Sequence, residues 1–129
     1  MSEKRSDITE YGKSVTFFPG DVIYEPEFLV GDPSAFLIVE GKVDVIKRYT
    51  PLQKEVFHFE KGDVFGVLEV YTGTPRLTQA VAVSEVKAVG YSKSELEKAM
   101  VGNLNFAIQS IRSLSRMLRQ INQKIKSLS

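Results

Sequence analysis

Few side chains in this sequence could carry out covalent chemistry. The chain has 129 residues, a single histidine (His58) and no cysteine. Without cysteine there is no disulfide, no thiolate metal site and no cysteine nucleophile. One histidine cannot supply the several converging ligands of a catalytic metal site, and it does not fit a Ser–His–acid triad. We therefore expect His58 on a strand, half-buried or exposed, and no metal site.

The remaining motifs also speak against an enzyme. Glu95 and Glu97 are paired carboxylates, but they fall on a predicted solvated helix rather than in a cleft. The sequence has no P-loop lysine motif and no glycine fingerprint of a dinucleotide site. We therefore expect a protein without catalytic residues.

Composition and charge limit the possible settings of the chain. It is 43% hydrophobic and 26% charged, an ordinary balance for one globular domain. No apolar run approaches membrane-spanning length, and the polar N-terminus is not a secretory signal, so the expected protein is cytoplasmic with no membrane contact. The net charge of +1 makes nucleic acid an unlikely partner. The segment from Asn103 onward, however, holds five of the 17 basic residues and none of the 16 acidic ones.

The elements that must position any site are mostly strands. Short segments rich in Val, Ile, Phe and Tyr alternate with turn signals, which predicts strands near residues 15–18, 21–25, 35–40, 42–49, 54–59, 80–83 and 86–91. Residues 42–59 read as a hairpin with Thr50 and Pro51 in its turn. The predicted fold is mainly β, a jelly-roll β-barrel or sandwich with a short helix and a long C-terminal dimerisation helix. The predicted divisions are a flexible arm (1–13), the β-roll (14–102) and the dimerisation helix (103–129).

Two helix starts are marked by capping residues. Ser92 and Glu95 form a predicted capping box, in which each side chain bonds the backbone amide of the other. Gly102 is a natural helix stop, and Asn103 is a natural N-cap for the helix that follows.

The last helix has a clear seven-residue repeat. Four apolar residues recur every seven positions, and a second series follows each by three: Leu104, Ile111, Leu118 and Ile125, then Ala107, Leu114, Ile121 and Leu128. This pattern is typical of a coiled coil. We expect the first two turns, through Leu104, Phe106, Ala107 and Ile108, to pack on the β-roll. The distal heptads would pair with the same helix of a second copy. The predicted homodimer interface consists of Leu104, Ile111, Leu114, Leu118, Ile121 and Ile125.

Four sequence blocks in order resemble a known family. They are residues 18–23, residues 31–33 with 36–43, residues 62–66, and residues 73–76 with 80–82. They resemble the cyclic-nucleotide-binding domain family, which includes the effector domain of the catabolite activator protein. The chain stops before the helix-turn-helix domain of that family's transcription factors, so we expect a stand-alone effector domain. Gly20, Gly41 and Gly62 sit at predicted sharp turns, where glycine tolerates positive φ.

The resemblance implies a phosphate-binding cassette near residues 65–79. The ligand would be a cyclic nucleotide such as cAMP or cGMP. In this family an arginine and the free amides of a short helix bind the cyclic phosphate, and an arginine fork suits a phosphate because it donates two parallel hydrogen bonds. The residues matching the cassette are Gly66, Val67, Leu68, Arg76 and Thr78. Asn122 matches a base-capping position in the long helix.

The cassette departs from the family at three positions. Val67 stands where the family has a glutamate for the ribose hydroxyl, which would cost about 1–3 kcal/mol of ligand binding. Leu77 replaces a small residue and is expected to fill space that the phosphate needs. Glu69 replaces a small apolar residue. It is expected to face solvent, with two alternatives: it contacts the ribose, or it pairs with Arg76 and occupies the anion site.

Two functions from different classes follow. The first is a non-enzymatic sensor that binds a cyclic nucleotide or a similar phosphate ligand through Arg76 and transmits binding to the long helix. The second is a ligand-blind homodimeric adaptor with a vestigial cassette, acting in signal transduction through another regulatory protein. Retention of Arg76 and Gly66 favours the sensor, whereas Val67 and Leu77 favour the adaptor.

Overall fold

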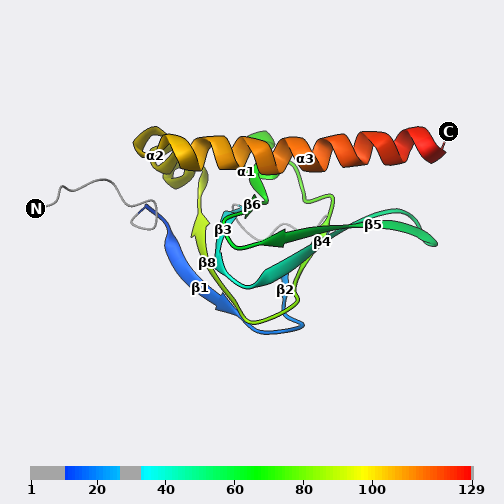
Figure 1. Ribbon diagram of the computed structural model, residues 1–129, viewed down its shortest axis with the longest axis horizontal. Coiled ribbons are helices and arrows are strands. Elements are labelled where there is room, and N and C mark those ends of the chain that lie inside the picture. The colour runs from blue at the N-terminus through cyan, green and yellow to red at the C-terminus, as the bar shows by residue number, and fades with distance from the viewer. Residues whose placement is uncertain (1–10, 27–32, 129) are drawn as a thin grey trace, which may run out of the picture.

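The computed structural model describes residues 11–26 and 33–128, and it consists of a β-roll with helices on one side (Figure 1). One four-stranded antiparallel sheet has the order β1 (Lys13–Phe17), β8 (Val86–Tyr91), β3 (Ala35–Glu40) and β6 (Val64–Phe65). The other has the order β2 (Val22–Tyr24), β7 (Gln79–Ala82), β4 (Lys42–Thr50) and β5 (Gln53–Glu60). The predicted jelly-roll-like, mainly β fold is confirmed. Most of the predicted N-terminal arm lies outside the described residues.

The predicted hairpin and glycine turns are present. Thr50 pairs with Gln53 between β4 and β5, so Pro51 and Leu52 form the tip. Gly20, Gly41 and Gly62 have φ of 91°, 104° and 91°. At Gly41 an added Cβ would also lie 2.3 Å from the carbonyl oxygen of Glu85. The predicted turns are therefore confirmed.

Two apolar clusters form the core. The first lies under the helices and comprises Ala35, Leu37, Val64, Val67, Val70, Val89, Tyr91, Leu96, Ala99 and Phe106. The second lies in the roll and comprises Ile38, Val43, Val45, Phe57, Phe59, Phe65, Ala80, Ala82, Val86 and Ala88. Strands β3 and β6 contribute to both clusters, so the helical side and the roll form one continuous body.

Three helices lie on the same side of the roll. They are α1 (Val67–Thr72), α2 (Lys93–Gly102) and α3 (Leu104–Leu128). The predicted capping box is confirmed, since Glu95 N donates to Ser92 Oγ at 3.3 Å and Ser92 N donates to Glu95 Oε1 at 2.8 Å. Asn103 caps the start of α3, because its Oδ1 accepts from Phe106 N at 3.0 Å. The predicted helix boundaries are therefore confirmed.

Helix α3 packs on the roll along far more than its first turns. Phe106, Ser110 and Ser113 are buried, and Met117 and Ile121 pack against the core of the roll. The β4–β5 hairpin runs beneath the distal half of the helix (Figure 1), where Gln120 Nε2 donates to Glu55 Oε2 at 2.9 Å. The prediction that Leu104 and Ile108 pack on the roll is wrong, because these residues are 72% and 37% exposed. The roll contacts a face offset from the apolar repeat, so the Leu104 series points away from it.

Candidate functional site

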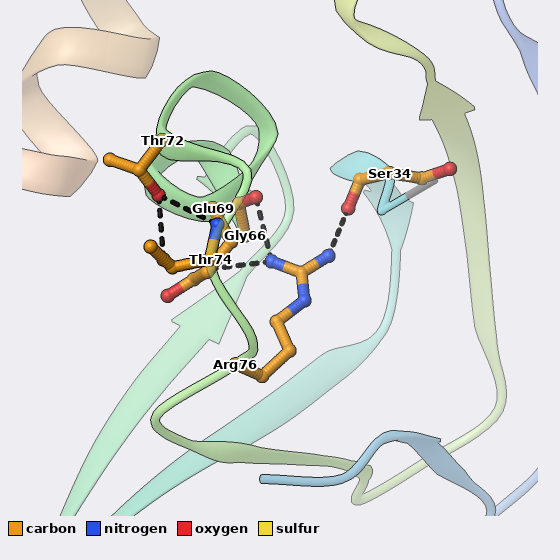
Figure 2. Close-up of polar contacts among 6 residues, drawn as sticks. All are labelled: Ser34, Gly66, Glu69, Thr72, Thr74 and Arg76. Carbon is orange, nitrogen blue, oxygen red and sulfur yellow. Dashed lines mark hydrogen bonds and ion pairs between the residues drawn. The ribbon is translucent and has the colours of Figure 1, made fainter. Parts of the chain in front are cut away.

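The guanidinium of Arg76 lies buried inside the cassette, with its donors directed at the protein itself (Figure 2). Its Nη1 donates to Glu69 Oε1 at 2.7 Å and to the carbonyl oxygen of Gly66 at 2.8 Å. Its Nη2 donates to the carbonyl oxygen of Ser34 at 2.5 Å. Arg76 and Glu69 are only 5% and 6% exposed. The carboxylate of Glu69 therefore binds the arginine fork from inside the protein.

The local backbone explains why these two side chains meet. Gly66 precedes α1 with φ of 81°, a left-handed conformation that favours glycine. An added Cβ there would lie 3.0 Å from Arg76 Nη1, so a side chain would also crowd the guanidinium. Because Glu69 lies in the first turn of a helix that starts at this turn, its carboxylate is brought over the arginine. An acidic side chain near a helix start is also favoured by the helix dipole.

Tyr24 forms the other wall of the arginine site. The guanidinium carbon of Arg76 lies 4.0 Å from the centre of the Tyr24 ring, which is a cation–π contact. Burial raises the pKa of Tyr24 to about 12, although Arg76 and a hydrogen bond with Thr78 act in the opposite direction. The phenol is therefore neutral at physiological pH, and the buried charges here are those of Arg76 and Glu69.

The cavity next to this pair is small. It has a volume of about 20 Å³. Its lining includes Tyr24, Val67, Leu68, Glu69 and Thr78 from the roll and α1, together with Leu114 and Met117 from α3. A cavity measured in this way needs about 10–15 Å³ to hold one water, whereas drug-sized ligands occupy pockets of roughly 300 Å³ or more. In this conformation the cavity has no room for a nucleotide.

The structure gathers most of the predicted ligand-binding residues around this cavity. Gly66, Val67, Leu68 and Thr78 all line it, and Arg76 bonds the carbonyl oxygen of Gly66 beside it. Val67 is buried and apolar where the resembling family has its ribose-binding glutamate. Asn122 is exposed on α3 and is not among the lining residues.

Two expectations for the cassette are wrong. Glu69 does not face solvent, because it is buried against Arg76; the internal ion pair, one of the alternatives, is what the structure contains. Leu77 does not fill the phosphate space, because it is 54% exposed. Buried residues alternate along Arg76, Thr78 and Ala80, so Leu77 is directed outward. The cassette is closed by a carboxylate and by α3 rather than by this leucine.

Sequence reasoning missed two contributors to the site. Ser34 contributes its backbone carbonyl, and a carbonyl leaves no signal in residue type. Tyr24 lies in the β2 segment, where an aromatic residue is typical of a strand and gives no hint of a cation partner. Their proximity to Arg76 depends on how the two sheets close, since residue 34 and residue 76 are 42 positions apart.

The face of α3 that points away from the roll carries four of the six predicted interface residues. Ile111 is 63%, Leu118 45% and Ile125 50% exposed, in the series that begins at Leu104. The second predicted series behaves differently, since Leu114 and Ile121 are half-buried and contact the roll side. The structure thus leaves four of the predicted interface residues exposed and places the other two at the boundary with the roll. Ile108, which we expected to pack on the roll, joins the four in an exposed stripe of Leu104, Ile108, Ile111, Leu118 and Ile125.

Other kinds of site find no support in the part of the chain that the structure describes. No group of three or more His, Asp or Glu side chains there could hold a metal ion. No described helix is both long and apolar enough to cross a membrane. His58 lies on β5 with its side chain 78% exposed, and its Nδ1 is 2.8 Å from Asp44 Oδ1.

Comparisons with known proteins agree with this architecture. The cyclic nucleotide-binding domain family matches residues 11–103. A cAMP-dependent protein kinase regulatory subunit from Hypocrea atroviridis is 30% identical over 99 residues, which cover 75% of this chain and 20% of the relative. A CRP-like cAMP-activated global transcriptional regulator from Mycobacterium tuberculosis is 27% identical over 104 residues, covering 78% of this chain and 46% of the relative. The chain thus matches less than half the length of these relatives.

Solved structures share the fold at low sequence identity. The catabolite activator protein of Thermus thermophilus has a TM-score of 0.74 and 19% identity, over 94% of this chain and 56% of that one. The heme domain of CooA from Carboxydothermus hydrogenoformans has a TM-score of 0.79 and 16% identity, over 95% of this chain and 84% of that one. With the family match over most of its length and a β-roll that carries a cassette and a long helix, this chain belongs to the cyclic nucleotide-binding domain family.

Proposed function

We propose that this domain is a ligand-independent regulatory module. Its anion site is filled by its own Glu69, and it acts through the exposed face of α3, which joins two copies. The observation that carries this proposal is the buried 2.7 Å pair between Glu69 Oε1 and Arg76 Nη1. The carboxylate and the carbonyl oxygens of Gly66 and Ser34 accept three hydrogen bonds from the guanidinium, so a phosphate would have to compete with them for the arginine.

The closed cassette also holds α3 in place. Leu68 on α1 and Leu114 and Met117 on α3 line the same small cavity, so the two helices lie against each other across it. A ligand acts as a switch only when it binds two arrangements of a protein with different affinity. Because Glu69 stays bound to Arg76, the domain keeps one conformation. The exposed face of α3 is then always accessible to a partner.

The exposed stripe on α3 supports pairing of two copies. Five large apolar side chains lie along one helix face with no acidic residue on the helix. A row of exposed apolar residues of this length marks an interaction surface. The seven-residue spacing from Leu104 to Ile125 fits a second identical helix, because such a repeat keeps one seam facing its partner over several turns.

A cyclic-nucleotide sensor is the second candidate function, and one observation favours it. Leu77 points outward, so the phosphate space is blocked by a movable carboxylate rather than by a fixed aliphatic plug. In this case cAMP or cGMP would displace Glu69 and open the contact between α1 and α3. The choice of ligand for this candidate function follows from two relatives whose names include cAMP.

Thermal unfolding with cAMP, cGMP and cyclic dinucleotides separates the two candidates. We expect no stabilisation of the wild type. The matched variant is Val67→Glu with Glu69→Ala, which removes the carboxylate bound to Arg76 and supplies an acceptor for the ribose hydroxyl. We expect this variant to gain stability with a cyclic mononucleotide, by about 2.7 kcal/mol at a hundredfold excess over its dissociation constant. Stabilisation of the wild type, lost on Arg76→Lys, would overturn the proposal in favour of the sensor.

A further inference from the structure

Four basic side chains form one row on the solvent side of α3. Arg112, Arg119 and Lys126 are seven residues apart, and Arg116 lies one turn after the first of them. Residues at these spacings share a helix face. All four are exposed, and we call them the basic row. It extends over about 21 Å, at about 1.5 Å per residue.

Three of the four side chains of the basic row have no acidic partner in the part of the molecule that the structure describes. Among the described residues, Arg112, Arg119 and Lys126 take part in no ion pair, and α3 contains no acidic residue. Arg116 has one distant partner, Asp63 Oδ2 at 3.6 Å, and remains half-exposed. By contrast, the rest of the chain carries 16 acidic against 12 basic residues. The segment from residue 103 onward is therefore net positive, whereas the rest of the chain is net negative.

The basic row also has a fixed relation to the apolar stripe. Arg112, Arg119 and Lys126 each directly follow a stripe residue, namely Ile111, Leu118 and Ile125. When a second copy covers the stripe, the basic row lies beside the seam. Its positive charges then flank a groove between the helices, and three of the four are arginines, whose planar fork suits carboxylates.

We propose that the basic row is a docking surface for an acidic helix of a partner protein, with carboxylates at a seven-residue spacing. A partner helix of the same length, about 10 Å wide, can lie along the row. Its carboxylates would meet the unpaired guanidinium and ammonium groups, and the repeat on both helices would set the register. This inference does not depend on whether the cassette binds a ligand.

A wide polyanion fits this face less well than a helix does. The adjoining surface groove, of about 450 Å³, is lined by three carboxylates, those of Asp44, Glu60 and Asp63, and by two basic side chains, Lys42 and Arg116. A nucleic-acid duplex or an anionic membrane pressed against the row would bring its phosphates toward these carboxylates, which repel them. The net charge of only +1 adds little general attraction.

Fluorescence anisotropy with a labelled synthetic helical peptide tests this proposal. The peptide carries glutamates seven residues apart on one face, and a glutamine version is its control. Three charges of the basic row are reversed in one variant, by Arg112→Glu, Arg119→Glu and Lys126→Glu together. The matched protein control reverses three exposed lysines on the roll and α2, by Lys61→Glu, Lys87→Glu and Lys98→Glu. Both variants change the net charge equally.

We expect the wild type to bind the glutamate peptide, and more weakly at high salt. Reversal of the basic row should weaken binding by about tenfold or more, since each exposed pair contributes up to about 1 kcal/mol. The roll control should change it less than about twofold. Failure of the wild type to bind, or equal binding by the row variant, would overturn the proposal. Equal or tighter binding of a DNA duplex or of phosphatidylserine vesicles would overturn the choice of partner. Oligomeric state, measured on the same samples, reports separately on the pairing of α3.

Discussion

The inner face of α3 packs on the roll, and the outer face points away from it. The two faces differ in how many of their polar and apolar side chains have partners. On the inner face, Leu114 and Met117 close a cassette in which Arg76 is paired with Glu69. Among the described residues, every buried side-chain nitrogen and oxygen has a hydrogen-bond partner. On the outer face, apolar side chains such as Ile111 are exposed beside unpaired cations. This contrast teaches that the surface available for new interactions is the outer helix face rather than the pocket.

Arg76→Ala, which breaks the buried ion pair on the inner face, should have the strongest effect. This change leaves the buried carboxylate of Glu69 without its cation, which costs about 3–5 kcal/mol of unfolding free energy. Adding Glu69→Leu should restore much of that loss, because the second change removes the uncompensated charge. Urea unfolding of the single and double variants measures both. Additive losses in the double variant would contradict a coupled buried pair.

Leu118→Glu, which places a charge in the exposed stripe on the outer face, should have the second-largest effect. A charge at the centre of a paired seam is expected to raise the dimer dissociation constant by about a hundredfold, or roughly 2–3 kcal/mol, with the monomer still folded. Light scattering after size exclusion measures the mass. Leu77→Glu is the control, because that leucine is comparably exposed but lies on the roll. A wild type that is monomeric at every concentration would show that the stripe does not join two copies.

A smaller effect concerns the polar contact at the distal end of the inner face. Glu55 accepts hydrogen bonds from Tyr49 Oη at 3.1 Å and Gln120 Nε2 at 2.9 Å. Gln120→Ala should cost about 1 kcal/mol of unfolding free energy and speed hydrogen exchange in the last turns of α3. Unchanged exchange there would mean that the apolar contacts of Ile121 alone hold this half of the helix.

The smallest effect is a pH dependence at the start of α2. Hydrogen bonding by the Ser92 amide lowers the pKa of Glu95 below its ordinary value of 4.5. The folded state therefore favours the ionised carboxylate, so this contribution is present above pH 4.5 and is lost as the pH falls through the lower, folded pKa. The stability difference between wild type and Glu95→Gln should shrink on going from neutral pH to about pH 3. A difference that grows on acidification would contradict this assignment.

Much of the fold could be predicted because its signals are local. The turn glycines, the β4–β5 hairpin and the capping box each depend on neighbouring residues, and each is present. The seven-residue repeat predicted the long helix for the same reason. It did not predict which face meets the roll, because that depends on the buried Phe106, Ser110 and Ser113.

The site was harder to predict, because its geometry depends on the closure of the roll. Arg76 was identified by resemblance, but its partners come from three separate segments, through Tyr24, Ser34 and Glu69. Sequence alone left Glu69 with three roles, since a carboxylate in a short helix points inward or outward depending on one turn. The left-handed Gly66 sets that turn.

The most direct test of the closed cassette is a nuclear magnetic resonance titration of the labelled wild type with excess cAMP. The amide signals of Gly66 and Glu69 and the guanidinium signals of Arg76 report on the fork itself. The account predicts that all of them stay unchanged, because the protein's own carboxylate already occupies the arginine. Saturable shifts of the Gly66 and Arg76 signals in the wild type would contradict it. In that case the Gly66 amide signal should no longer shift in the Arg76→Lys variant.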